Sequence, residues 1–104
     1  MTEIFVIAEE ELVIAFKMIG VEGVAATGAE DALAAFRGAI GAAEACKMLI
    51  LTEDIADMLG SELIDWQLAG RYPLIVEIPP LSGSSPDHVK LVDAVRQAIG
   101  IKIQ

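Results

Sequence analysis

Apolar residues gather into four short runs along the chain, at residues 3–8, 24–26, 47–51 and 74–78. Each run is almost continuously apolar, which is typical of strands in a parallel sheet that helices cover on both faces. The last run contains Glu77 and is followed by Pro79 and Pro80, features that suit a strand at the edge of the sheet. The pattern predicts four parallel strands.

The first two segments between these runs carry helix signals. Residues 9–19 form the first predicted helix, which Gly20 ends. Thr27 and Glu30 have the spacing of a capping box, so a second helix is expected to start there. Its apolar stripe consists of Leu33, Phe36 and Ile40.

A third helix is predicted between the third and fourth runs. Thr52 suits the N-cap position, and Gly70 suits the C-terminal stop after Ala69. Gly60 and Ser61 lie in the middle of this segment and mark a bend. We therefore expect one long, bent helix here.

The C-terminal part begins with residues 81–86, which are rich in Gly, Ser and Pro and predict a loop, and continues with a predicted helix at residues 87–99. Right-handed crossovers then give helices on both faces of a sheet of strand order 2-1-3-4, an α/β fold of flavodoxin-like or Rossmann-like type. We expect a globular α/β domain at residues 1–80 and a hinge with a C-terminal helix at residues 81–104.

The first predicted helix has apolar residues on two sides. At about 100° per residue, one side carries a stripe that suits contact with the sheet. That stripe consists of Leu12, Val13, Phe16 and Ile19. Ile14 and Met18 fall on the opposite side, one helical turn apart and flanked by Glu10, Glu11 and Lys17.

The third predicted helix repeats this arrangement, with Ile64 and Leu68 opposite its core stripe. The stripe consists of Ile55, Leu59, Leu63 and Trp66. In the last predicted helix the apolar residues span nearly half the circumference, which is wide for contact with one neighbour. They are Leu91, Val92, Ala94, Val95, Ala98 and Ile99.

Single exposed apolar residues are normal on a protein surface, but two pairs and one broad stripe favour a protein partner. The predicted partner-binding residues are Ile14, Met18, Ile64, Leu68, Leu91, Val92, Val95 and Ile99.

Charge and composition narrow the class of protein. The chain has 104 residues and a net charge of −9, without a cluster of Lys or Arg, so an acidic nucleic-acid backbone would repel it. Its apolar runs are shorter than the roughly 20 residues of a membrane-spanning helix, and its N-terminus lacks the basic start of a signal peptide. We expect a cytoplasmic protein without direct membrane insertion, in which the single cysteine, Cys46, is a buried thiol.

The sequence contains no set of residues that is typical of a catalytic site. His88 is the only histidine, and we expect it at the surface. The chain has neither a zinc-ligand spacing nor a glycine-rich phosphate loop. We expect no catalytic residue, no cofactor and no metal, and a function in binding.

Acidic residues at the predicted strand ends leave one alternative open. Receiver domains of phosphorelay signalling hold Mg²⁺ there and carry a phosphoacceptor Asp after the third strand, where this chain has Thr52. The alternative is a degenerate receiver-like regulatory module that binds Mg²⁺ or a small ligand at Glu9, Glu10 and Glu53. Carboxylates in a first helical turn are also explained by the helix dipole alone.

Four segments resemble a known family, the F subunits of the A/V-type rotary ATPases. Residues 15–21 (AFKMIGV) are similar to its GFRLAGV segment, with Ala15 in place of the first Gly, and residues 51–56 (LTEDIA) to its ITExIA turn. Residues 72–79 (YPLIVEIP) and 91–101 (LVDAVRQAIGI) resemble its fourth strand and its C-terminal helix. The order and spacing of the segments together make the resemblance specific.

The resemblance implies a non-catalytic protein of the central stalk. In that family the F subunit binds the D subunit, which is a long coiled coil, and the pair forms the rotor shaft inside the hexamer of nucleotide-binding A and B subunits. The C-terminal helix of the family lies along or projects toward that assembly, where it modulates ATP hydrolysis or synthesis coupled to ion transport, including hydrogen ion transport. The protein would then be cytoplasmic and peripheral to the membrane as part of a membrane-bound complex.

Overall fold

The sheet has the strand order that the sequence predicts. The computed structural model describes residues 3–41 and 46–83. Within these ranges a parallel sheet of order β2-β1-β3-β4 is formed by β1 (Ile4–Ala8), β2 (Glu22–Ala25), β3 (Met48–Thr52) and β4 (Leu74–Ile78). The predicted α/β class is confirmed, and β4 lies at one edge of the described sheet, as Glu77 and the prolines indicated.

The helices differ from the prediction at one point. They are α1 (Glu10–Met18), α2 (Ala29–Gly41), α3 (Glu53–Leu59) and α4 (Ser61–Ala69). The prediction of one bent helix after Thr52 was wrong, because Gly60 has φ 58° and ψ −129° and separates α3 from α4. A residue with a side chain rarely adopts such a positive φ. Glycine at position 60 therefore lets the chain change direction where another residue would strain the backbone.

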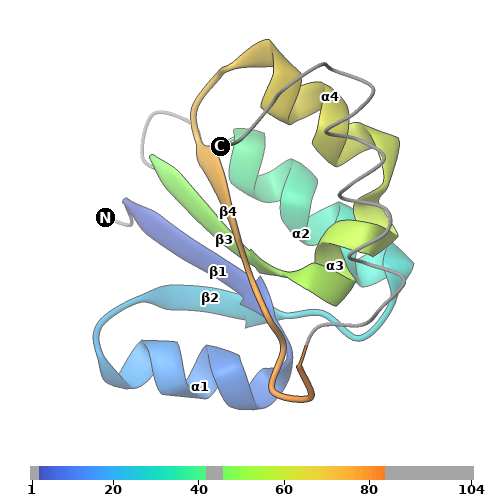
Figure 1. Ribbon diagram of the computed structural model, residues 1–104. Coiled ribbons are helices and arrows are strands. Elements are labelled where there is room, and N and C mark those ends of the chain that lie inside the picture. Colours follow the sequence, from blue (N-terminus) through green and yellow to red (C-terminus); the bar gives the residue numbers. More distant parts are fainter. Residues whose placement is uncertain (1–2, 42–45, 84–104) are drawn as a thin grey trace, which may run out of the picture.

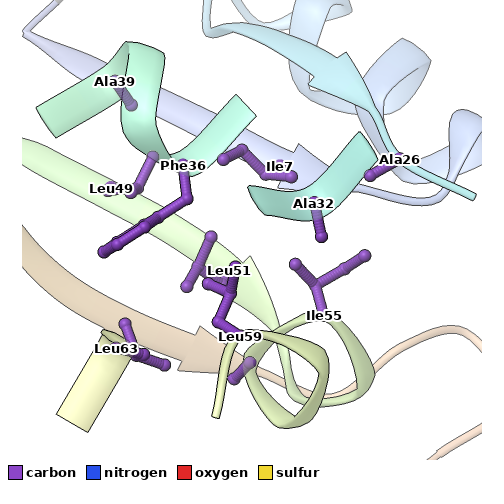
Figure 2. Close-up of a cluster of buried hydrophobic side chains, with 11 residues drawn as sticks. Ile7, Ala26, Ala32, Phe36, Ala39, Leu49, Leu51, Ile55, Leu59 and Leu63 are labelled. Carbon is purple, nitrogen blue, oxygen red and sulfur yellow. The ribbon is translucent and has the colours of Figure 1, made fainter. Parts of the chain in front are cut away.

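The helices lie in two layers. In Figure 1, α1 lies on one side of the sheet, while α2, α3 and α4 lie on the other. The larger core lies beneath α2, α3 and α4, where Phe36 and Ile55 meet side chains of β1 and β3 (Figure 2). The smaller core lies beneath α1, where Val13 packs with Val6 and Ala8 of β1.

Two local predictions were wrong at helix ends. Ile19 was placed in the core stripe, but it lies just beyond the last helical residue of α1, so the 100° step no longer applies and its side chain is 75% exposed. The capping box is also absent. The carbonyl of Gly28 accepts the first hydrogen bond of α2, so Thr27 precedes the cap and its hydroxyl donates instead to Asp31, at 3.0 Å.

Other core predictions are confirmed. Leu63 and Leu59 are buried in the larger core, with Trp66 half-buried against it. Cys46 is a buried free thiol, and burial raises its pKa.

Candidate protein-interaction site

The outer side of α1 presents an apolar patch. Ile14 is 53% and Met18 82% exposed, while Val13, next to Ile14, is buried in the smaller core. Ile19, directly after the last residue of α1, is also exposed. We call Ile14, Met18 and Ile19 the α1 patch. Ile19 was not among the predicted contact residues, although the adjacent Gly20 indicated that the helix ends there.

The predicted pair on α4 lies on the other side of the molecule. Leu68 is 60% exposed and Ile64 is half-buried. Because α1 covers one face of the sheet and α4 lies on the other (Figure 1), the structure does not bring this pair together with the α1 patch. The four predicted contact residues of the C-terminal segment, and His88, lie outside the described residues.

A third apolar surface was not predicted. On the face of the sheet that carries α1, Leu74 and Val76 of β4 are 50% and 37% exposed. They pair in register with Met48 and Ile50 of β3, whereas Ile75, which points to the opposite face, packs against the larger core. We call Leu74, Val76, Met48 and Ile50 the open sheet face. The sequence signal for this surface is that successive side chains of β4 point to opposite faces of the sheet. This signal predicts exposure only when it is known which helices cover each face.

The carboxyl ends of the strands hold the acidic residues of the alternative hypothesis. Glu10 lies in the first turn of α1 and Glu53 in the first turn of α3, where a carboxylate is favourable for the helix dipole. The Glu9 side chain accepts a hydrogen bond from the backbone N–H of Leu81, at 2.8 Å. Glu9 therefore ties the loop after β4 to the start of α1.

The alternative hypothesis also concerns how these carboxylates are grouped in residues 3–41 and 46–83. Across those ranges, no group of three or more His, Cys, Asp or Glu side chains is arranged to hold a metal ion. Thr52, at the position of a phosphoacceptor, is fully buried at the N-cap of α3, and its hydroxyl has no hydrogen-bond partner. A side chain closed off from solvent is not placed to accept a phosphoryl group.

Cationic side chains meet aromatic rings near the start of β4. The guanidinium of Arg71 lies 4.9 Å from the ring centroid of Trp66, and the Lys47 Nζ lies 5.5 Å from that of Tyr72. The Trp66 indole N–H donates to the carbonyl of Pro73 at 3.0 Å, and the ring meets Phe36 edge to face. These contacts fix the end of α4 against the sheet.

One ion pair joins two helices of the same layer. Both Nε and a terminal nitrogen of Arg37 on α2 donate to the carboxylate of Glu62 on α4. The hydrogen bond from Arg37 lowers the pKa of Glu62 below its ordinary value of 4.5. Both groups are exposed, so solvent screens the attraction and its effect on stability is small.

Comparison with known proteins identifies a family. Residues 4–98 match the family model described as ATP synthase (F/14-kDa) subunit. That range includes every strand and helix of the described fold. No curated protein matches the chain. In the part of the chain that the structure describes, none of the helices has both the length and the apolar character for crossing a bilayer.

Proposed function

The chain belongs to the ATP synthase (F/14-kDa) subunit family, and from this premise we propose that it is a non-catalytic component of the central stalk of an A/V-type rotary ATPase. The observation that carries the proposal is the family match over residues 4–98. The resemblance of residues 15–21, 51–56, 72–79 and 91–101 to the F subunits supports the finer assignment to the A/V type.

The proposed partner is the coiled-coil D subunit, and the proposed contact is the α1 patch. Ile14 and Met18 are one turn apart on the outer side of α1, a spacing that lets them enter the groove of another helix. Acidic residues in the first turn of α1 flank the pair and would meet basic side chains of the partner. Such an apolar centre with a charged rim is typical of protein interfaces.

The pair on α4 serves a different contact in this proposal. Since α1 and α4 lie on opposite faces of the sheet, one coiled coil that covers the α1 patch leaves Leu68 and Ile64 accessible. We assign these two residues to another protein of the stalk or head. Residues 81–104 act as the hinge and the C-terminal regulatory element that modulates ATP hydrolysis or synthesis coupled to ion transport.

Co-expression with the coiled-coil partner from the same organism tests the proposal. The expected result is a stable one-to-one complex that copurifies and elutes as a single species in size-exclusion chromatography. The isolated chain is expected to show no ATP hydrolysis. Absence of the complex at micromolar concentrations of both chains would contradict the assignment to the central stalk.

A further inference from the structure

Two basic side chains lie at the edge of the sheet where β3 and β4 begin. Lys47 directly precedes β3, and Arg71 lies shortly before Leu74, the first residue of β4. The two strand starts are side by side, because the backbone N–H of Leu74 donates to the carbonyl of Lys47 at 2.9 Å. Tyr72 belongs to the same segment, and its side chain is 56% exposed. We call Lys47, Arg71 and Tyr72 the cationic edge.

The length of the strands separates the cationic edge from the acidic residues at the other end of the sheet. All four strands are parallel, so they begin at one edge and end at the opposite one. A strand as long as β3 spans about 17 Å, which keeps Glu53 away from Lys47. Glu3 lies beside Lys47 at the same edge, but the two side chains form no ion pair with each other. The cationic edge is therefore a local exception on a chain of net charge −9.

Aromatic rings hold both cations in position. The Lys47 Nζ lies over the ring of Tyr72, and the guanidinium of Arg71 lies over the ring of Trp66. Trp66 is in turn fixed by its hydrogen bond to Pro73. The N–H groups of a guanidinium lie in its own plane, so a group stacked on a ring can still donate to both oxygens of a carboxylate.

Neither cation is neutralised by the part of the chain that the structure describes. Across residues 3–41 and 46–83, the ion pair joins Arg37 to Glu62, and neither Lys47 nor Arg71 forms one with a carboxylate of those ranges. Both side chains are exposed. Because the rings already restrict them, less side-chain entropy is lost when they bind a partner.

We propose that the cationic edge binds an acidic segment of a partner protein, in which apolar side chains lie between the carboxylates. Carboxylates of the segment accept hydrogen bonds from Arg71 and pair with Lys47, and its apolar side chains cover the exposed ring of Tyr72. Arg and Tyr are among the residue types enriched in the energetic centres of protein interfaces. This contact involves neither the α1 patch nor the D subunit, so it does not depend on the proposed function.

Single-stranded nucleic acid is the competing partner, because its binding sites also combine cations with stacking rings. The structure favours the protein segment. Trp66 is half-buried between Arg71 and Phe36, which leaves Tyr72 as the exposed ring of the cluster. A phosphate backbone also brings more negative charge against a chain of net charge −9 than a few carboxylates do.

An NMR titration of the full chain with a capped peptide of alternating glutamate and leucine tests the proposal. We expect shifts of the amides of residues 46–48 and 71–74 and of the Trp66 indole N–H, which decrease when salt is added. The same peptide with glutamine in place of glutamate is expected to bind about tenfold more weakly. Absence of shifts at millimolar peptide, equal binding of both peptides, or shifts centred on Lys17 would overturn the proposal.

Variants that remove one charge but keep a long polar side chain locate the binding site. Arg71→Gln and Lys47→Gln are each expected to weaken peptide binding about fivefold, the effect of losing one exposed ion pair. Lys17→Gln removes a charge at the end of α1 and is the matched control, with unchanged affinity expected. Circular dichroism checks that each variant is folded. Unchanged affinity in a chain that carries both substitutions at the cationic edge would contradict the assignment.

Two further probes distinguish the competing ligands. A single-stranded oligonucleotide that shifts the same resonances and binds more tightly than the glutamate peptide would assign the cationic edge to nucleic acid. Inorganic phosphate that displaces the peptide at equal concentration would show a general anion site. Either result would overturn the proposal of a protein partner, whereas failure of both to compete supports it.

Discussion

The two faces of the sheet differ in how completely the described helices cover them. On one face α2, α3 and α4 enclose a continuous core that includes Phe36, Leu49 and Leu51. On the other face, α1 is the only helix within residues 3–41 and 46–83; it encloses a smaller core around Val6 and Val13, and Leu74 and Val76 of β4 are partly exposed there. The first face holds the fold together, whereas the second offers surface for contacts beyond it.

Adjacent residues of β3 give the sharpest test of this difference. Leu49 is fully buried on the covered face, and Ile50 is half-buried on the other. We expect Leu49→Ala to lower the free energy of unfolding by about 4 kcal/mol and Ile50→Ala by about 1 to 2 kcal/mol, because truncation costs most where a cavity remains. Urea denaturation of the full chain measures both values. Equal losses would show that the two faces are covered alike.

The α1 side depends on close backbone packing at β2. A Cβ at Gly23 would lie 2.5 Å from the carbonyl oxygen of Val6 on β1, closer than atoms can approach. We expect Gly23→Ala to destabilise the protein by about 2 kcal/mol or more, since β1 and β2 would have to separate.

Gly38 provides the matched control for this substitution. It lies within α2, with no atom near the position of an added Cβ. Gly38→Ala is expected to stabilise the protein by up to about 1 kcal/mol, because alanine favours the helix. Thermal denaturation compares the two variants, and a stable Gly23→Ala protein would show that the strands tolerate the contact.

Substitutions in the α1 patch are expected to separate binding from folding. If the α1 patch is the contact for the proposed partner, the D subunit, Ile14→Asp and Met18→Asp should each weaken that binding by about 2 kcal/mol, roughly 30-fold, since each removes an apolar anchor and adds a charge. Stability should change by no more than about 0.5 kcal/mol, because both side chains are exposed. Calorimetric titration measures the affinity and circular dichroism the stability.

Ala34→Asp controls for the added charge, since Ala34 is an exposed residue of α2 on the covered face. Its affinity for the D subunit should equal that of the wild type. If the α1 variants bind normally while Leu68→Asp does not, the contact lies on α4 and the assignment of the two surfaces must be exchanged.

The smallest expected effect is the pH dependence of the ion pair between α2 and α4. The folded protein holds the pKa of Glu62 below its unfolded value, so the pair stabilises the fold above that unfolded value. This contribution disappears as the pH falls through the lower, folded pKa. The stability difference between the wild type and Glu62→Gln should therefore be small at pH 7 and vanish once the pH has fallen below the folded pKa of Glu62. A difference that grows on acidification would contradict the sign.

The fold was predictable because its main signals are local. Continuous apolar runs marked the strands, and the crossover rule gave their order. The break at Gly60 was harder, since a glycine in a helical pattern is compatible with either a bend or a separation into two helices. Only the observed positive φ distinguishes the two.

The interaction surfaces were only partly predictable. The exposure of Ile14 and Met18 followed from helical periodicity, which depends on nearby residues alone. Exposure of Leu74 and Val76 depends on which half of the sheet each helix covers, and that arrangement is a property of the assembled layers. Helical periodicity also could not show that Ile14 and Met18 on α1 face away from Ile64 and Leu68 on α4.

The position of Trp66 gives the protein a built-in optical reporter. It is the only tryptophan, and its ring is held between Phe36 and Arg71 on the covered face, with its N–H bonded to Pro73. Its fluorescence therefore senses the packing of α4 and is remote from the α1 patch. A change in emission when a partner binds at α1 would mean that the sheet transmits a displacement from one layer to the other.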